Sequence, residues 1–260
     1  MTGAGSGLGA ATARALAARG MTVAVFDRDE GRATEVSASI GEAAISCAGD
    51  VSDPEAVEAA LDRLVGRGQL RLAVSCAGIG IVERTVAPKG APHALESFQR
   101  VHDVNVTGTF NVARLAAARM ASNPPDADGG RGLIVNTASI AAFDGQTGQV
   151  AYGSSKAAVV GLTLPMARDL APLGVRVVTI APGSFDTPMN NLPPEILSRL
   201  PEPTRERWQA GHDRISAAIQ FPRRDGRPEE YARFVLQLLD SPYLNGEVVR
   251  LDAGLRLPAK

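Results

Sequence analysis

Short apolar runs alternate with longer amphipathic stretches along most of the chain. The apolar runs cover residues 22–27, 42–46, 71–78, 132–139 and 175–183, and "NGEVVRLDAG" near the end holds one more. Residues 132–139 and 175–183 are rich in β-branched residues and are closed by small residues or Pro-Gly, which is typical of buried strands. The intervening stretches 10–19, 54–65, 95–120, 149–173 and 228–239 have helical periodicity, with Asp53 as an N-cap.

Strands that alternate with helices pair in parallel and place helices on both faces of the sheet. The pattern therefore predicts an α/β fold, a Rossmann-like doubly wound parallel sheet. Three stretches interrupt it, at residues 85–94, 121–132 and 184–227. The last holds six prolines and Trp208, and connections of that length are often functional. We expect one domain over residues 1–260, with residues 184–227 as a substrate-covering lid.

Composition narrows the classes of protein that the chain can represent. The 260 residues carry a net charge of −1 without a basic block, which gives no electrostatic case for nucleic acid or an anionic membrane. No apolar run reaches the length of a membrane span, and no secretion signal opens the chain. Cys47 and Cys76 do not form a disulfide framework, and no metal site is predicted. We expect a cytoplasmic protein.

A glycine-rich turn opens the chain, with Gly3, Gly7 and Gly9 leading into the first helix. Glycines at such a turn let backbone approach a pyrophosphate, which binds the free N–H groups of the helix N-terminus. The spacing differs from the general dinucleotide fingerprint, so a flexible tail is the alternative. Asp27 favours the nucleotide site, because a carboxylate closing the next strand would accept from a ribose 2′-OH and repel a 2′-phosphate. We expect NAD rather than NADP, although Arg28 could soften that preference.

Tyr152 and Lys156 form a second candidate site. Four residues apart on a helix, they share one face, so the ammonium can lie beside the phenol. The positive charge of Lys156, with that of an oxidised nicotinamide, would lower the phenol pKa and suit it to acid–base work. An exposed polar pair is the plain alternative. Ser139 ends a strand thirteen residues earlier, at the sheet edge where ligands bind, and could hold a substrate carbonyl.

These residues together resemble the short-chain dehydrogenase/reductase family. The matching positions are Gly3, Gly7, Gly9, Asp27, residues 48–51, residues 76–78, Asn105, Ser139, Tyr152, Lys156 and residues 181–183. Residues 93–115, 131–188 and 245–254 are most similar to members that act on 3-hydroxyacyl-CoA and on hydroxysteroids. The resemblance implies an NAD-dependent oxidoreductase that interconverts a secondary alcohol and a ketone.

The resemblance also implies a role for individual residues. The cofactor would be contacted by Ser6, Leu8, Asp27, Asp50, Val51, Cys76, Ala77, Gly78, Pro182, Gly183, Phe185 and Thr187. Tyr152 would be the acid–base, Lys156 would bind the nicotinamide ribose, and Ser139 would orient the substrate. Asn105 would kink its helix and complete a proton relay through water, although a helix-interior Asn that meets a backbone group is the plain alternative. Gln146 would reach the substrate, and the chain would form a homotetramer.

The sequence departs from the family pattern at three places. Ser75 stands where Asn is usual, and residues 201–213 resemble an insertion in the lid. Only Met1 and Thr2 precede the glycine turn, where a central strand is expected, so that strand is predicted to be missing from the chain as given. Its loss would leave neighbouring ladder groups unpaired, each at a cost of kilocalories. Rival functions are a hydroxysteroid, small-ketone or sugar dehydrogenase, and a non-catalytic scaffold.

Overall fold

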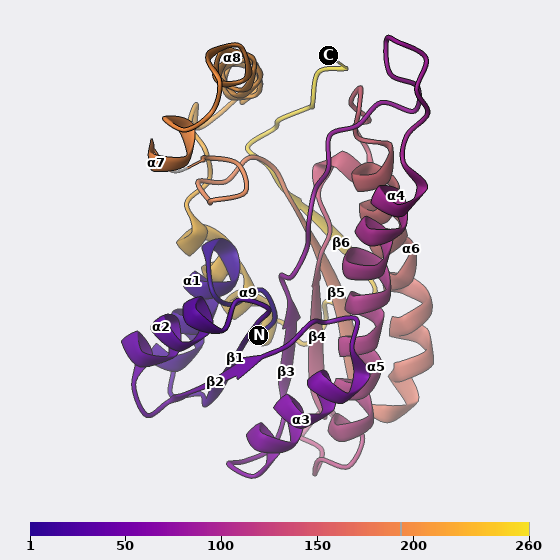
Figure 1. Cartoon of the computed structure of the whole chain (residues 1–260). Coiled ribbons are helices and arrows are strands. Elements are labelled where there is room, and N and C mark those ends of the chain that lie inside the picture. The colour runs from indigo at the N-terminus through magenta and orange to yellow at the C-terminus, as the bar shows by residue number, and fades with distance from the viewer. Residues whose placement is uncertain (193, 260) are drawn as a thin grey trace.

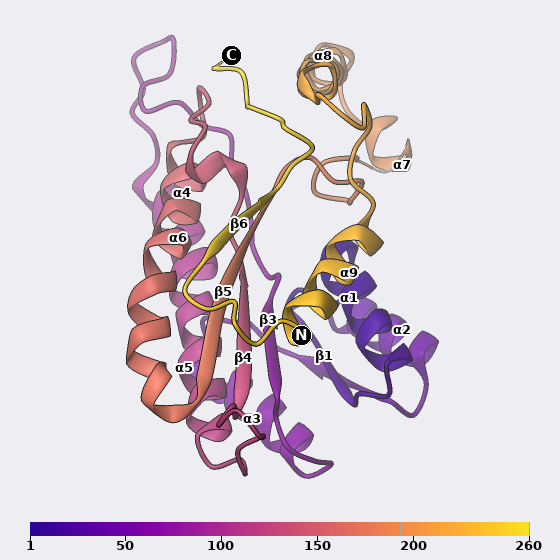
Figure 2. The same cartoon turned by 180° about the vertical axis from the view of Figure 1, so that it is seen from behind.

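A central parallel sheet lies between two layers of helices (Figure 1). The computed structural model describes residues 1–192 and 194–259. Helices α1, α2 and α9 cover one face, and α3, α4, α5 and α6 cover the other, as the view from behind also shows (Figure 2). The predicted doubly wound α/β fold is therefore confirmed. Among the helices of the described residues, none is both long and apolar enough to cross a bilayer.

The strands run parallel wherever they pair. Their bounds are β1 Val23–Asp27, β2 Ala44–Ala48, β3 Leu72–Ser75, β4 Gly132–Thr137, β5 Val175–Pro182 and β6 Val248–Leu251. β1 pairs with β2, and β3, β4, β5 and β6 follow one another in that order. The strands β1, β3, β4 and β5 are almost entirely buried, because helices pack on both sides of them. Every predicted strand is present, with ends shifted by a few residues.

Met1 and Thr2 hold the position between β1 and β3. Thr2 bridges both neighbours, Phe26 in β1 and Ser75 in β3. Its N–H donates to the carbonyl of Val74 at 3.0 Å, and its carbonyl accepts from the N–H of Cys76 at 3.2 Å. Beside these residues lies an apolar cavity of about 40 Å³, lined by Met1 and by side chains of both sheet halves.

The predicted helices are present, although one of them is interrupted, and α2, α7 and α8 were not predicted. Their bounds are α1 Gly7–Ala18, α2 Glu30–Ile40, α3 Pro54–Val65, α4 Leu95–His102, α5 Thr109–Met120, α6 Val150–Leu170, α7 Pro194–Leu197, α8 Glu202–Ala218 and α9 Pro228–Leu239. Asp53 caps α3 as predicted, accepting from the N–H groups of Glu55 and Ala56. The sequence did not reveal α2, because only Ala33 and Val36 of that helix are buried and its apolar stripe is narrow.

The predicted continuous helix over residues 95–120 is wrong. A π-helical stretch, Asp103–Gly108, separates α4 from α5, and it includes Asn105. Single-turn π-bulges of this kind often occur at functional sites. The interruption therefore falls at the residue for which the family resemblance implies a kink.

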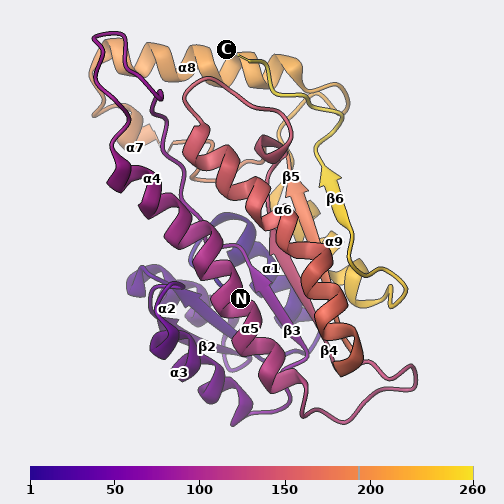
Figure 3. The same ribbon diagram turned by 90° about the vertical axis from the view of Figure 1, so that its right-hand side faces the viewer.

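The stretch 184–227 is not the loop that its prolines suggested. It contains α7 and the seventeen-residue α8, which lies across the end of the molecule toward which the strand arrows of β5 and β6 point (Figure 3). Ile215 and Ala218 of α8 pack against a cluster formed by Ile140, Ile219 and Leu255. The segment therefore covers the carboxyl edge of the sheet as a packed helical element.

Candidate active site

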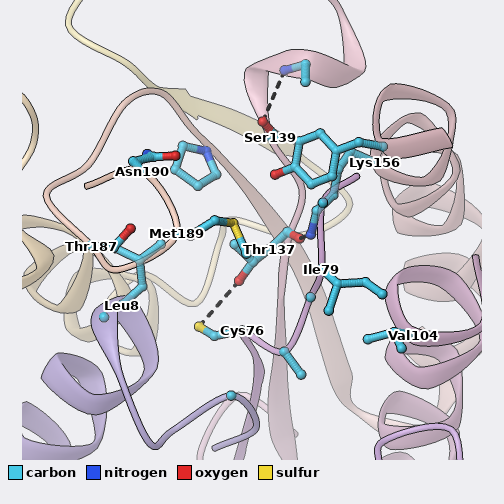
Figure 4. A pocket seen from close by; sticks show the side chains of 18 of the residues that line it. Leu8, Cys76, Ile79, Val104, Thr137, Ser139, Lys156, Thr187, Met189 and Asn190 are labelled. Atoms are coloured by element: carbon cyan, nitrogen blue, oxygen red, sulfur yellow. Dashed lines mark hydrogen bonds between the residues drawn. The ribbon is translucent and has the colours of Figure 1, made fainter. Parts of the chain in front are cut away.

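A cleft of about 490 Å³ opens at the carboxyl ends of the strands. It brings together every predicted site residue except Asn105: Gly3, Ser6, Gly7, Leu8, Gly9, Asp27, Asp50, Val51, Cys76, Ala77, Gly78, Ser139, Gln146, Tyr152, Lys156, Pro182, Gly183, Phe185 and Thr187. Leu8, Thr187 and Asn190 lie on one side of the cleft, and Ser139 and Lys156 lie on the other (Figure 4). Residues far apart in the sequence therefore form one site.

The glycine turn forms the floor of the cleft. Glycine is required there for two reasons, the backbone conformation at Gly3 and Gly7 and the close packing at Gly9. Gly3 and Gly7 have φ angles of +59° and +49°, a region that side-chain-bearing residues rarely adopt. A Cβ on Gly9 would lie 2.1 Å from the carbonyl oxygen of Gly3. Ser6, the N-cap of α1, makes no side-chain capping bond. The first-turn N–H groups of α1 therefore remain available to an anion, which fits a dinucleotide pyrophosphate.

Asp27 holds its carboxylate beside this turn. One carboxylate oxygen accepts from the N–H of Gly5 at 2.9 Å, and the other accepts from the N–H of Asp29 at 3.0 Å. Two backbone donors therefore fix the orientation of the carboxylate at the end of β1. Its placement fits a ribose hydroxyl and disfavours a 2′-phosphate.

The far wall of the nucleotide half includes Asp50 and Cys76. Burial would raise the pKa of Asp50, but hydrogen bonds from Ser52 and the charge of Arg100 lower that pKa overall. Asp50 is therefore a fixed carboxylate at neutral pH. Burial raises the pKa of the Cys76 thiol, whose sulfur lies 3.5 Å from the hydroxyl oxygen of Thr137. The thiol is therefore neutral, which leaves its backbone as the part suited to line the groove.

Ser139 lies immediately beyond β4 and begins a 3₁₀ turn, Ile140–Ala142. Its hydroxyl oxygen accepts from the N–H of Ala141 at 3.1 Å. This bond orients the hydroxyl and leaves its proton free to be donated. A hydroxyl held in this way can donate to a substrate carbonyl or to a neighbouring phenol.

Tyr152 and Lys156 lie on one face of α6, as predicted. The ammonium nitrogen of Lys156 lies 5.9 Å from the centroid of the Tyr152 ring and donates to the carbonyl of Thr137 at 2.8 Å. Burial lowers the pKa of Lys156 to about 8, and the nearby Cys76 opposes this shift. Lys156 therefore remains mainly protonated at pH 7.

The phenol of Tyr152 differs from the prediction in the direction of its pKa shift. Burial raises the pKa of Tyr152, and only the hydrogen bond with Ser139 acts against it. The predicted lowering by Lys156 is wrong for the protein by itself, because the ammonium points to a backbone carbonyl rather than to the phenol oxygen. The resting phenol is therefore protonated at neutral pH.

Asn105 lies behind the cleft and is fully buried. Its side-chain oxygen accepts from the N–H of Ile79, and its side-chain nitrogen donates to the carbonyl of Ile79 and to the hydroxyl of Ser155, each at 2.9 Å. Ser155 is the residue before Lys156. Asn105 therefore ties the segment after β3 to the helix that carries Tyr152 and Lys156.

Several residues line the cleft that sequence reasoning did not find. They are Ile79, Gln149, Asn190, Ile215 and Leu257, among others. No motif distinguishes them, because they come from α8, the end of the chain and connections whose positions depend on packing. Three of the five, Ile79, Ile215 and Leu257, are aliphatic.

Comparisons with known proteins agree with this site. A family model described as short chain dehydrogenase matches residues 1–195. The 3-hydroxyacyl-CoA dehydrogenase type-2 of Drosophila melanogaster is 47% identical over 99% of this chain and 96% of its own, and the human protein of that name is 44% identical over 99% and 94%.

Two solved structures extend the comparison to the fold. The crystal structure of 3-hydroxyacyl-CoA dehydrogenase type-2 from Mycobacterium avium matches with a TM-score of 0.89 and 38% identity, covering 100% of this chain and 95% of that one. A 3-ketoacyl-(acyl-carrier-protein) reductase from Brucella melitensis, complexed with NADH, matches with a TM-score of 0.78 and 28% identity, covering 97% and 95%. With the glycine turn and the Ser139, Tyr152 and Lys156 arrangement, these matches establish that the chain belongs to the short-chain dehydrogenase/reductase family of oxidoreductases.

Proposed function

We propose that the protein interconverts 3-hydroxyacyl-CoA and 3-ketoacyl-CoA thioesters of short acyl length, using NAD. The observation that carries the proposal is that Ser139, Tyr152 and Lys156 line the same cleft as the glycine turn. Ser139 and Lys156 lie on the side opposite Leu8 (Figure 4). The names of the relatives supply the substrate class. A hydroxysteroid is the second candidate, because an apolar cleft would also accept a rigid apolar ketone.

Each side chain of the site has a distinct task in this reaction. In the reductive direction the Tyr152 phenol donates its proton to the ketone oxygen, while the Ser139 hydroxyl donates a hydrogen bond to that same oxygen. In the oxidative direction the Tyr152 phenolate takes the hydroxyl proton of the substrate. The raised pKa of Tyr152 keeps the proton on the phenol for the reductive direction, and the positive charge of an oxidised cofactor would lower that pKa for the oxidative direction.

The cofactor assignment depends on the nucleotide half of the cleft. The amides of the glycine turn and α1 would hold the pyrophosphate, Asp27 the adenosine ribose, Asp50 and Val51 the adenine, and Lys156 the other ribose. Phe185 and Thr187, just after Pro182 and Gly183, would hold the carboxamide. The bound nicotinamide supplies the hydride acceptor in oxidation and the hydride donor in reduction. The Asp27 carboxylate favours NAD over NADP, since a 2′-phosphate would face a fixed negative charge.

Two larger features belong to the same proposal. Residues 184–227 act as a lid over the substrate, because α8 lies across the carboxyl edge of the sheet and contributes Ile215 to the cleft. The enzyme is a homotetramer, with part of the apolar surface of α6 paired with another subunit. Analytical ultracentrifugation tests the subunit number, and a monomer at micromolar concentration would refute it.

The test is NADH oxidation with acetoacetyl-CoA by the unaltered chain, by Tyr152→Phe and by Tyr243→Phe. Removing the Tyr152 hydroxyl removes the proton donor, so kcat falls by about 10³-fold, while NADH binding measured by fluorescence stays unchanged. Tyr243 is fully exposed, so its variant keeps full activity. Unchanged turnover in Tyr152→Phe would refute the mechanism, and NADH binding without turnover of any acyl-CoA would refute the substrate.

A further inference from the structure

Residues 255–259, which we call the tail segment, run along the loop that joins Ser139 to Tyr152. The N–H of Leu257 donates to a carboxylate oxygen of Asp144 at 3.2 Å. The side-chain nitrogen of Gln146 donates to the carbonyl of Pro258 at 3.1 Å. The carbonyl of Ala259 accepts from both the N–H and the hydroxyl of Thr147, at 3.0 and 2.9 Å. The tail segment is thus bonded to a loop that lies directly between two residues of the catalytic set.

Arg250 of β6 fixes both partners of this contact. Its guanidinium donates to the two carboxylate oxygens of Asp144 at 3.3 and 2.8 Å, to Asp252 at 2.7 Å and to the carbonyl of Leu255 at 3.0 Å. The three charged side chains are largely buried, with exposures of 23% for Arg250, 14% for Asp144 and 9% for Asp252. The Arg250 bonds also hold the pKa of Asp144 below its usual range. A bidentate, largely desolvated pair of this kind fixes geometry more strongly than an exposed pair does.

The inner face of the tail segment is apolar and faces the cleft. Leu255 is fully buried against Ile140, which follows Ser139, and against Ile219 at the end of α8. Leu257 and Ile215 pack on the same cluster, and both line the cleft together with Ile140. Three separate parts of the chain therefore form one aliphatic wall next to the catalytic serine.

We propose that the tail segment is a wall of the substrate chamber, that the Arg250–Asp144 pair positions it, and that Leu257 and Ile215 set the length of acyl chain the enzyme accepts. The proposal rests on the proposed function for its thioester substrates. Leu257 and Ile215 are specificity-determining residues, because their side chains occupy the volume into which a longer acyl chain would extend. Arg250 and Asp144 are positioning residues that act on the substrate only through the tail segment and Gln146.

The first arm of the test measures kcat and KM for 3-ketoacyl-CoA thioesters of increasing chain length, with NADH, in Leu257→Ala and Ile215→Ala. Both variants enlarge the apolar end of the chamber. We expect kcat/KM to rise about fourfold for each added methylene that the new space can bury, so that the preferred acyl chain becomes longer than in the unaltered enzyme. We call the set of kcat/KM values over increasing chain length the ladder. A ladder identical to that of the unaltered enzyme would overturn the assignment of Leu257 and Ile215 as the wall that limits chain length.

The second arm tests the pair with Asp144→Asn, measured by amide hydrogen exchange and by the same ladder. The amide group would place a donor against the N–H of Leu257 or against the guanidinium, so exchange over 255–259 increases at least tenfold and KM rises more than kcat falls. The matched control is Asp240→Asn, whose partner Arg19 also binds it through two bonds, but with both side chains about half exposed and the pair joining α1 to α9. We expect Asp240→Asn to leave unchanged both the amide hydrogen exchange of the tail segment and the kcat/KM values over the series of chain lengths. Unchanged exchange in Asp144→Asn would overturn the positioning role, as would increased exchange without any change in KM.

The proposed acyl-CoA substrate can be wrong even if the tail segment does form a wall of the substrate chamber, so the two proposals are tested separately. If the unaltered enzyme reduces no acyl-CoA, the proposed function is refuted, and the ladder is run with linear β-keto ethyl esters of increasing length. A lengthened preference in Leu257→Ala with these esters would support the wall. The same preference as in the unaltered enzyme would overturn it.

Discussion

Replacing Asn105 with alanine removes the connection between the segment after β3 and helix α6. The side chain is fully buried and makes three hydrogen bonds, two to the backbone of Ile79 and one to Ser155. Alanine cannot replace them, so the N–H and the carbonyl of Ile79 lose a partner next to the cleft. A buried polar group left without a partner costs about 1–3 kcal/mol. Both groups of Ile79 are only partly buried beside the cleft, where water can replace part of the lost bonds, and the serine can rotate to a new partner. We therefore expect the free energy of unfolding to fall by about 2–3 kcal/mol.

Denaturant unfolding of Asn105→Ala measures this loss, and Asn123→Ala is the matched control. Asn123 is also buried and donates to two backbone carbonyls, those of Leu70 and Arg131, but it does not line the cleft. We expect comparable destabilisation in the two variants. Only Asn105→Ala should lower kcat by more than tenfold under conditions where both proteins are folded, because only Asn105 holds the helix of Tyr152. A loss of less than about 1 kcal/mol in Asn105→Ala would refute the stabilisation assigned to its hydrogen bonds. Equal kcat values in Asn105→Ala and Asn123→Ala would show that Asn105 has only a structural role.

Three further predictions concern charge and backbone. Burial lowers the pKa of Lys156 to about 8, so the ammonium is present below that pH and is lost above it. The reductive kcat/KM should therefore fall above about pH 8, and Lys156→Arg should remove this decline. A pH profile of the unaltered enzyme that stays flat to pH 10 would contradict the prediction. Hydrogen bonds from Arg224 lower the pKa of Glu230 from 4.5 to about 2, so this pair stabilises the fold above pH 4.5 and loses its effect as pH falls toward 2. Glu230→Gln should cost about 1–2 kcal/mol at pH 7 by thermal unfolding, a figure discounted for the exposure of the pair, and an equal cost at pH 2 would contradict the assignment. Gly9→Ala would place a Cβ 2.1 Å from the carbonyl oxygen of Gly3 and should weaken NADH binding at least tenfold by fluorescence titration, whereas unchanged affinity would refute the close approach.

Local patterns determined the strands and most of the helices. A buried strand between two helical layers must be apolar along its length, and runs such as residues 175–183 therefore predict their own position. The glycine turn and the Tyr152–Lys156 spacing were equally local, since each depends on the geometry of a single turn or helix. The sequence did not predict α2 because so few of its residues are buried. It did not predict α8 because the segment is rich in prolines and polar residues and packs only at one edge of the molecule.

The sequence by itself determined the fold class and the family, and it predicted the residues of the nucleotide turn and the catalytic set, because these depend on short-range periodicity and on spacing within one element. Only the tertiary structure decided the direction of the Tyr152 pKa shift, since that depends on burial and on the carbonyl of Thr137 to which Lys156 donates. It also decided that Ile215 and Leu257 meet beside Ile140. Such contacts join residues from separate elements of the chain, and their partners are selected by packing rather than by any pattern along the sequence.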